Sequence, residues 1–144
     1  MANPVCEVLL TGAQLNAPEN RVDPAAGARI DFQGIVRASE HGREIEGIDY
    51  EAHRGMAEHQ LKQIAEQAAM QFELRSVIIH HRIGFVAVGE ASLFMRVCSG
   101  HREAAFQASR WIVEELKKKV PIWKRPRFGT ESQRCPSHSK AATV

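Results

Sequence analysis

The sequence has little of what would place a protein in a membrane, in a disulfide-bonded fold or around a metal ion. No stretch approaches the ~20 apolar residues that a membrane-spanning helix needs, and the first residues show no basic segment followed by an apolar run. Cys6, Cys98 and Cys135 are far apart and odd in number, which fits neither a disulfide framework nor a metal-ligand spacing. These absences predict a cytoplasmic protein in a reducing compartment, with no metal site and no membrane contact.

Two further absences narrow the possible functions. The glycines form neither a phosphate-binding loop nor a dinucleotide-binding pattern. The formal net charge of +2 is too small to imply nucleic-acid binding by itself, although residues 117–127 carry several bases and no acid. A nucleic-acid surface would also need a wider basic face and stacking aromatics, whereas aromatic residues make up 6% of the chain. We therefore expect no nucleic-acid partner.

The chain is long enough for one domain with a substantial core, and its apolar pattern predicts two helices among short strands. The helices are expected at residues 56–72 and about 101–119, with Ser99 as the N-cap of the second helix and Pro121 ending it. Strands are expected at residues 5–10, 29–37, 44–52, 76–81, 91–98 and 121–128, with a short one inside 84–89. Gly34 predicts a bulge, and we expect strands 29–37 and 44–52 to pair as a hairpin.

This order of elements lacks strict alternation of strand and helix. It predicts an α+β domain with a mostly antiparallel sheet. A single domain is expected to span residues 1–128. Residues 129–144 are polar, small and aperiodic, which predicts a disordered tail.

The second predicted helix carries cations at both ends. Lys117, Lys118 and Lys119 near its C-terminus are ordinary, because they meet the negative end of the helix dipole. His101 and Arg102 in its first turn face the positive end, where an anion is favoured. They indicate either a site for a phosphate or carboxylate, or a solvated helix end with a small electrostatic cost.

Two more cations have an ordinary and a functional interpretation. Lys124 follows the corner at Pro121, and it shares a pocket with Lys117 if the segment after the corner folds back over the helix end. Two neighbouring ammonium groups lower each other's pKa, and a desolvated lysine serves as an acid, a base or a nucleophile near neutral pH. Arg37 ends a predicted strand and, taken alone, is a surface arginine.

Several motifs, in the same order along the chain, resemble the family of the large, catalytic subunit of molybdopterin synthase. The matching segments fall between residues 29 and 125, and each is weak by itself. Together, in register, they are a specific match: Phe32-Gln33-Gly34-Ile35-Val36-Arg37, Ile48-Asp49-Tyr50-Glu51-Ala52-His53, His80-His81-Arg82-Ile83-Gly84, Ser99-Gly100-His101-Arg102-Glu103, and Leu116-Lys117 with Val120-Pro121-Ile122-Trp123-Lys124.

The resemblance implies an α/β hammerhead-type fold with two main helices, and a sulfurtransferase that requires no cofactor. The family transfers sulfur from the C-terminal thiocarboxylate of a small, ubiquitin-like carrier subunit to cyclic pyranopterin monophosphate. This transfer forms the dithiolene of molybdopterin in molybdenum cofactor biosynthesis. Two large subunits are expected to form a homodimer and, with the small subunits, a heterotetramer.

The resemblance also implies the site residues. The two important lysines of the family fall on Lys117 and Lys124, which we expect to be catalytic. Its substrate-binding residues fall on Arg37, His101 and Arg102, which we expect to hold the phosphate and the pterin.

The end of the chain departs from the family pattern, since no tryptophan follows Trp123. In the family this terminal region helps to close the pocket. The sequence therefore leaves a second interpretation, in which the protein binds the sulfur carrier but has lost turnover.

Overall fold

The structure, a computed structural model, describes residues 3–129 and 142–143. Its elements are β1 (Val5–Thr11), β2 (Ala28–Ile35), β3 (Ser39–Glu40), β4 (Arg43–Ala52), α1 (Arg54–Gln71), β5 (Ser76–Arg82), β6 (Gly84–Ala87), β7 (Ala91–Ser99), α2 (Arg102–Lys119), β8 (Ile122–Phe128) and β9 (Ala142–Thr143). Each predicted helix and strand is present, with its ends within two residues of the expected ones. The two-residue strands β3 and β9 were not predicted.

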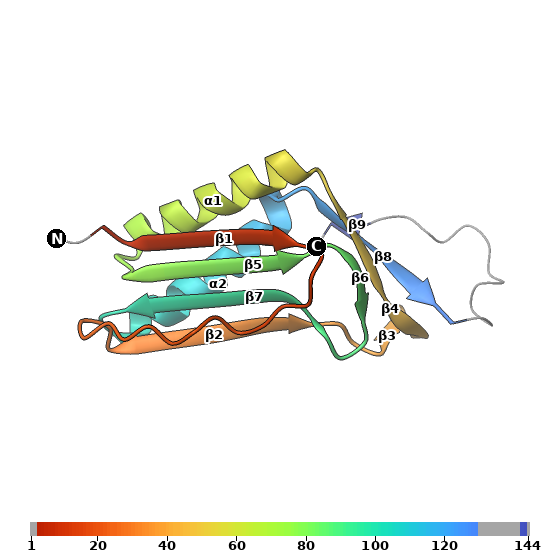
Figure 1. The fold of residues 1–144 in the computed structure, drawn as a ribbon, viewed down its shortest axis with the longest axis horizontal. Helices are drawn as coiled ribbons and strands as arrows, with labels where there is room; N and C mark the ends of the chain where they lie inside the picture. Colours follow the sequence, from red (N-terminus) through yellow and green to blue (C-terminus); the bar gives the residue numbers. More distant parts are fainter. Residues whose placement is uncertain (1–2, 130–141, 144) are drawn as a thin grey trace.

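Four strands form the main sheet, in the order β1-β5-β7-β2 (Figure 1). β1 pairs with β5 in parallel, whereas β7 pairs antiparallel with both β5 and β2. The β2–β7 ladder shifts register between Gly34 and Ile35, which confirms the predicted bulge. The sheet is therefore mixed but mostly antiparallel, and the α+β fold class is confirmed.

A second sheet lies at one end of the first (Figure 1). In it β4 pairs antiparallel with β3, β6 and β8, and β8 also pairs with β9. The predicted hairpin between residues 29–37 and 44–52 is wrong, because β2 pairs with β7 while β4 belongs to the second sheet. Alternation of apolar residues decides which face a side chain takes, but it does not decide which strand lies beside it.

Both helices cover the same face of the main sheet (Figure 1). Small side chains on α1 and α2 let the two helices approach the sheet closely. The helices pack against every second residue of β5 and β7. The fully buried residues of this core include Ala57, Leu61, Ala65, Val77, Ile79, Met95, Val97, Ala105, Ala108 and Ile112. Residues 12–27 run back along the opposite face, where the carbonyl groups of Pro18 and Glu19 accept hydrogen bonds from Arg96.

The start of α2 differs from the prediction. Its N-cap is His101 rather than Ser99, whose hydroxyl donates a hydrogen bond to the carbonyl group of His101. Within the described part of the chain, no side chain caps the first turn of α2. Its leading N–H groups are therefore not occupied by a side-chain acceptor, which suits an anion at this end.

The expected disordered tail, residues 129–144, falls mostly outside the described residues. Ala142 and Thr143 are described, and they pair with Lys124 and Trp123 of β8. These two residues form β9, and the expectation for the rest of the tail stays a prediction.

Candidate functional site

A tight turn fixes an acidic side chain next to two of the predicted site residues. β3 and β4 form a hairpin across His41 and Gly42, whose φ angles of 52° and 76° are both positive. Two consecutive positive φ angles are typical of a type I′ turn, in which glycine adopts the second position without strain. The residue that this hairpin holds in place is Glu40, at the end of β3.

Glu40 joins Arg37 to Lys124. Its Oε1 atom lies 3.8 Å from Nη2 of Arg37 and 3.6 Å from Nζ of Lys124. The side chain of Glu40 is 11% exposed, against 30% for Lys124 and 77% for Arg37. The carboxylate is thus the buried partner, while both cations keep surface toward solvent. Two site residues that the resemblance assigned are brought together by a residue that it did not assign.

Tyr50 lies on the same face as Lys124. The two residues are directly opposite each other in the β4–β8 ladder, so their side chains leave the same side of the second sheet. Tyr50 is buried. Burial raises the pKa of its phenol above the usual value, the charge of Glu40 adds to the rise, and a hydrogen bond with Ser92 opposes it. Its hydroxyl therefore stays protonated at neutral pH.

His81 links this face to the end of α2. Its ring packs edge-on against Tyr50, with 5.4 Å between the ring centroids. Burial lowers the pKa of His81 to about 4, although a hydrogen bond with the Arg82 carbonyl opposes the change. Nδ1 donates that bond at 2.8 Å, because a carbonyl oxygen only accepts. Nε2 has no hydrogen-bond partner among the described residues.

A small cavity of about 30 Å³ connects His81 with Lys117. Its other lining residues are apolar and come from β7, from α2 and its C-cap residue Val120, and from the start of β8. One of them is Ile122, which shares the inner face of β8 with Lys124, two residues further on. The segment after Pro121 thus returns past the end of α2, so Lys117 and Lys124 lie at the same end of the molecule.

His101 and Arg102 lie at the opposite end of α2 from Lys117. They flank an open hollow of about 440 Å³ at the start of α2, together with Gly27, Gly100 and Glu103. Lys117 follows Arg102 by fifteen positions along the helix, which at 1.5 Å per residue is about 22 Å. Within one chain, the five predicted site residues therefore form two groups: Arg37, Lys117 and Lys124 at one end of α2, and His101 with Arg102 at the other.

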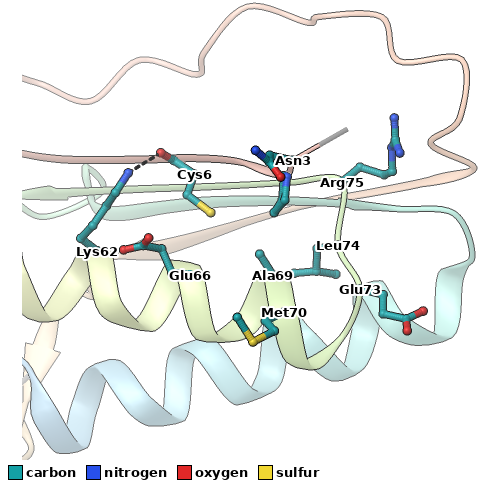
Figure 2. Close-up of a pocket in the computed structure, with 10 residues that line it drawn as sticks. Asn3, Cys6, Lys62, Glu66, Ala69, Met70, Glu73, Leu74 and Arg75 are labelled. Atoms are coloured by element: carbon teal, nitrogen blue, oxygen red, sulfur yellow. Dashed lines mark hydrogen bonds between the residues drawn. The ribbon is translucent and has the colours of Figure 1, made fainter. Parts of the chain in front are cut away.

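A larger hollow, of about 780 Å³, contains none of the predicted site residues. It lies between β1 and the C-terminal half of α1, where Cys6, Lys62 and Met70 are among the lining residues (Figure 2). Nζ of Lys62 donates a hydrogen bond of 2.8 Å to the Cys6 carbonyl. Burial raises the pKa of the Cys6 thiol, which makes it less reactive at neutral pH.

None of the helices in residues 3–129 is long and apolar enough to cross a membrane. The same part of the chain contains no group of three or more His, Cys, Asp or Glu side chains arranged to hold a metal ion.

Sequence reasoning missed Glu40, Tyr50 and His81 as members of the site. Tyr50 and His81 stand inside the motifs that carry the resemblance, so that signal was present. Glu40 stands outside them, in a polar turn, and only the pairing of β3 with β4 reveals its place.

Comparisons with known proteins show the family to which the chain belongs. A protein-family model described as "MoaE protein" matches residues 10–119. The molybdopterin synthase catalytic subunit of Neosartorya fischeri is 41% identical over 122 residues, which cover 83% of this chain and 65% of that protein. The chain therefore spans slightly less than two thirds of that relative.

Solved structures show the same fold. Molybdopterin synthase from Staphylococcus aureus superposes with a TM-score of 0.77 at 29% identity, covering 86% of this chain and 91% of that one. A complex of subunits 1 and 2 of the molybdopterin-converting factor from Helicobacter pylori gives 0.63 at 18% identity, covering 96% and 89%. The sequence match over residues 10–119 and the shared fold confirm the family that the motifs predicted: the chain belongs to the MoaE family, that of the molybdopterin synthase catalytic subunits.

Proposed function

We propose that this protein is a sulfurtransferase, the catalytic subunit of a molybdopterin synthase. It takes sulfur from the C-terminal thiocarboxylate of a small carrier subunit and transfers it to cyclic pyranopterin monophosphate. The observation that supports the proposal is that Glu40 joins Arg37 to Lys124 on the strand that follows the Lys117 end of α2, in a chain of this family.

The chemistry asks for positive charge and proton donors at that place. The substrate carries a phosphate, and each transfer forms a carbon–sulfur bond on the pterin and breaks a carbon–oxygen bond there. Water then cleaves the bond between the sulfur and the acyl carbon of the carrier, which leaves as a carboxylate. Arg37 is mostly exposed and has donors left for a phosphate beyond the one that faces Glu40. The ammonium groups of Lys117 and Lys124 stabilise negative charge on the departing oxygen and supply its proton.

The other predicted pair, His101 and Arg102, needs a second copy of the chain to join this site. A pyranopterin phosphate is too small to touch both ends of α2 when these lie about 22 Å apart. We infer that two copies form a dimer in which the α2 start of one completes the lysine site of the other. Phe106 lies one turn from Arg102, and its side chain is 65% exposed, which suits a surface that a second copy covers.

The sulfur donor is a separate small protein in this proposal. The Helicobacter pylori structure holds two subunits of a molybdopterin-converting factor, which supports a corresponding partner for this chain. Two such partners on a dimer of this chain make the expected heterotetramer.

The proposal is tested by mixing the protein with the thiocarboxylated carrier and cyclic pyranopterin monophosphate and measuring molybdopterin. Formation of molybdopterin is the expected result. A stable complex with the carrier and no product would contradict the proposal and favour the non-catalytic carrier-binding protein instead.

A further inference from the structure

We propose that Glu40 is a positioning residue of the sulfur-transfer site. Its carboxylate holds the Lys124 ammonium group in place, and its negative charge weakens the binding of the substrate phosphate. The inference rests on the proposed function, because it assigns a role at the same site. It concerns a residue outside the motifs that identify the family.

Two cations converge on a single atom. Both Nη2 of Arg37 and Nζ of Lys124 lie within 4 Å of the same Oε1 atom of Glu40. Arg37 follows β2 and Lys124 stands in β8, so the carboxylate ties together two segments of distant sequence. The hairpin turn at His41 and Gly42 fixes the backbone of Glu40 itself, which makes the carboxylate the fixed point of the three.

The exposures of Arg37 and Lys124 show that neither cation is a buried charge in need of a partner. Lys124 and Arg37 are 30% and 77% exposed, so neither cation needs Glu40 to remain charged. An ammonium group has three N–H donors and a guanidinium group has five. Each cation lies at ion-pair distance from Glu40 and keeps N–H donors for a ligand on the solvent side.

The negative charge of Glu40 has two consequences for an anionic substrate. It attracts Lys124 and so limits the positions that the ammonium group takes. The ammonium group then stays near the place where the oxygen departs. The negative charge also repels a phosphate that binds to the same two cations, which weakens substrate binding. Glu40 further helps Tyr50 remain protonated, since its charge raises the pKa of that phenol.

Replacing the carboxylate by an amide of the same shape separates these effects. Glu40→Gln is expected to lower kcat for molybdopterin formation about tenfold, because Lys124 is no longer held, and to lower KM for the pyranopterin severalfold, because the repulsion is gone. Glu44→Gln is the matched control: Glu44 is exposed, in the same hairpin, and stands opposite Ser39. It is expected to leave both constants unchanged.

Glu40→Asp keeps the charge but shortens the reach. It is expected to lower kcat while leaving KM near the wild-type value. An unchanged kcat in Glu40→Gln, or a KM that rises as kcat falls in both Glu40 variants, would overturn the proposal, since a damaged fold weakens binding and turnover together.

A measurement without turnover keeps the inference separate from the proposed function. Inorganic phosphate is titrated into the wild-type protein, Glu40→Gln and Glu44→Gln, with binding followed by NMR shifts of the backbone amide groups near Arg37. Tighter phosphate binding by Glu40→Gln alone is the expected result, and equal affinity in all three proteins would overturn the inference. A wild-type protein that makes no molybdopterin but shows this difference would contradict only the proposed function.

Discussion

Tyr50 on β4 and Lys124 on β8 face each other across an antiparallel ladder, and their side chains leave the same side of the sheet. This register, rather than the local sequence, puts Lys124 on the side of the sheet that carries Tyr50, where its ammonium group lies 3.6 Å from the carboxylate of Glu40. A shift of one residue in the ladder would turn Lys124 to the outer face, where Trp123 and Arg125 are exposed. The geometry of the site therefore depends on the pairing of β4 with β8.

Substitution of either lysine of the site should lower the rate of molybdopterin formation, whereas substitution of a neighbouring lysine on α2 should not. Lys117→Ala and Lys124→Ala are each expected to lower the rate of molybdopterin formation by about a hundredfold or more, because each removes a cation that stabilises the departing oxygen. Lys118→Ala is the control, since Lys118 is an ordinary cation at the helix end. Normal product formation by Lys117→Ala would remove Lys117 from the catalytic machinery.

A site shared between two copies predicts complementation. Lys117→Ala and Arg102→Ala are each expected to be nearly inactive alone. In a mixed dimer one site carries both substitutions and the other carries neither. Mixing equal amounts, with exchange of subunits, should therefore restore about a quarter of the wild-type activity.

The control for this experiment mixes two variants from the same end of α2, Lys117→Ala and Lys124→Ala. Each site of a mixed dimer then contains one substitution, so little activity should return. If the mixture of Lys117→Ala with Arg102→Ala also stays inactive while subunits exchange, the site is complete within one chain.

The buried His81 predicts a dependence of stability on pH. The folded protein holds the pKa of His81 at about 4, below the ordinary value of 6.5, so the unfolded chain binds a proton more readily. Stability from this residue is complete above about pH 6.5 and falls as the pH drops toward 4, by at most about 3 kcal/mol.

Urea unfolding at several pH values tests this dependence. His81→Phe should lose the part of the slope between pH 6.5 and 4, whatever its stability at neutral pH. The exposed His59 on α1 serves as the control, and His59→Gln should keep the wild-type slope. An identical slope in His81→Phe would show that other groups cause the acid sensitivity.

The close approach of β4 to β6 depends on Gly47. A Cβ atom at this position would meet the Val86 carbonyl oxygen and the ring of Phe85. Gly47→Ala is therefore expected to lower the free energy of unfolding by about 1–3 kcal/mol. Gly55→Ala is the matched control, because a Cβ atom at Gly55 meets nothing within 4 Å. Thermal unfolding of both variants should show a lower Tm for Gly47→Ala only.

The sequence by itself determined the elements of this protein. The apolar stripes of residues 56–72 and 101–119 predicted α1 and α2 because helical period and side-chain burial are local properties. The bulge at Gly34 and the extended segment after Pro121 are local for the same reason. The motifs also identified the family, and with it the residues expected to carry the chemistry.

Only the tertiary structure decided which of those residues meet. Strand pairing joins segments far apart in the chain, and for this reason the predicted hairpin was wrong. For the same reason the sequence could not predict the register that places Tyr50 opposite Lys124. The place of Glu40 follows from the pairing of β3 with β4 and of β4 with β8. The length of α2 likewise separates Arg102 from Lys117, because a rigid helix with 1.5 Å per residue holds its two ends apart.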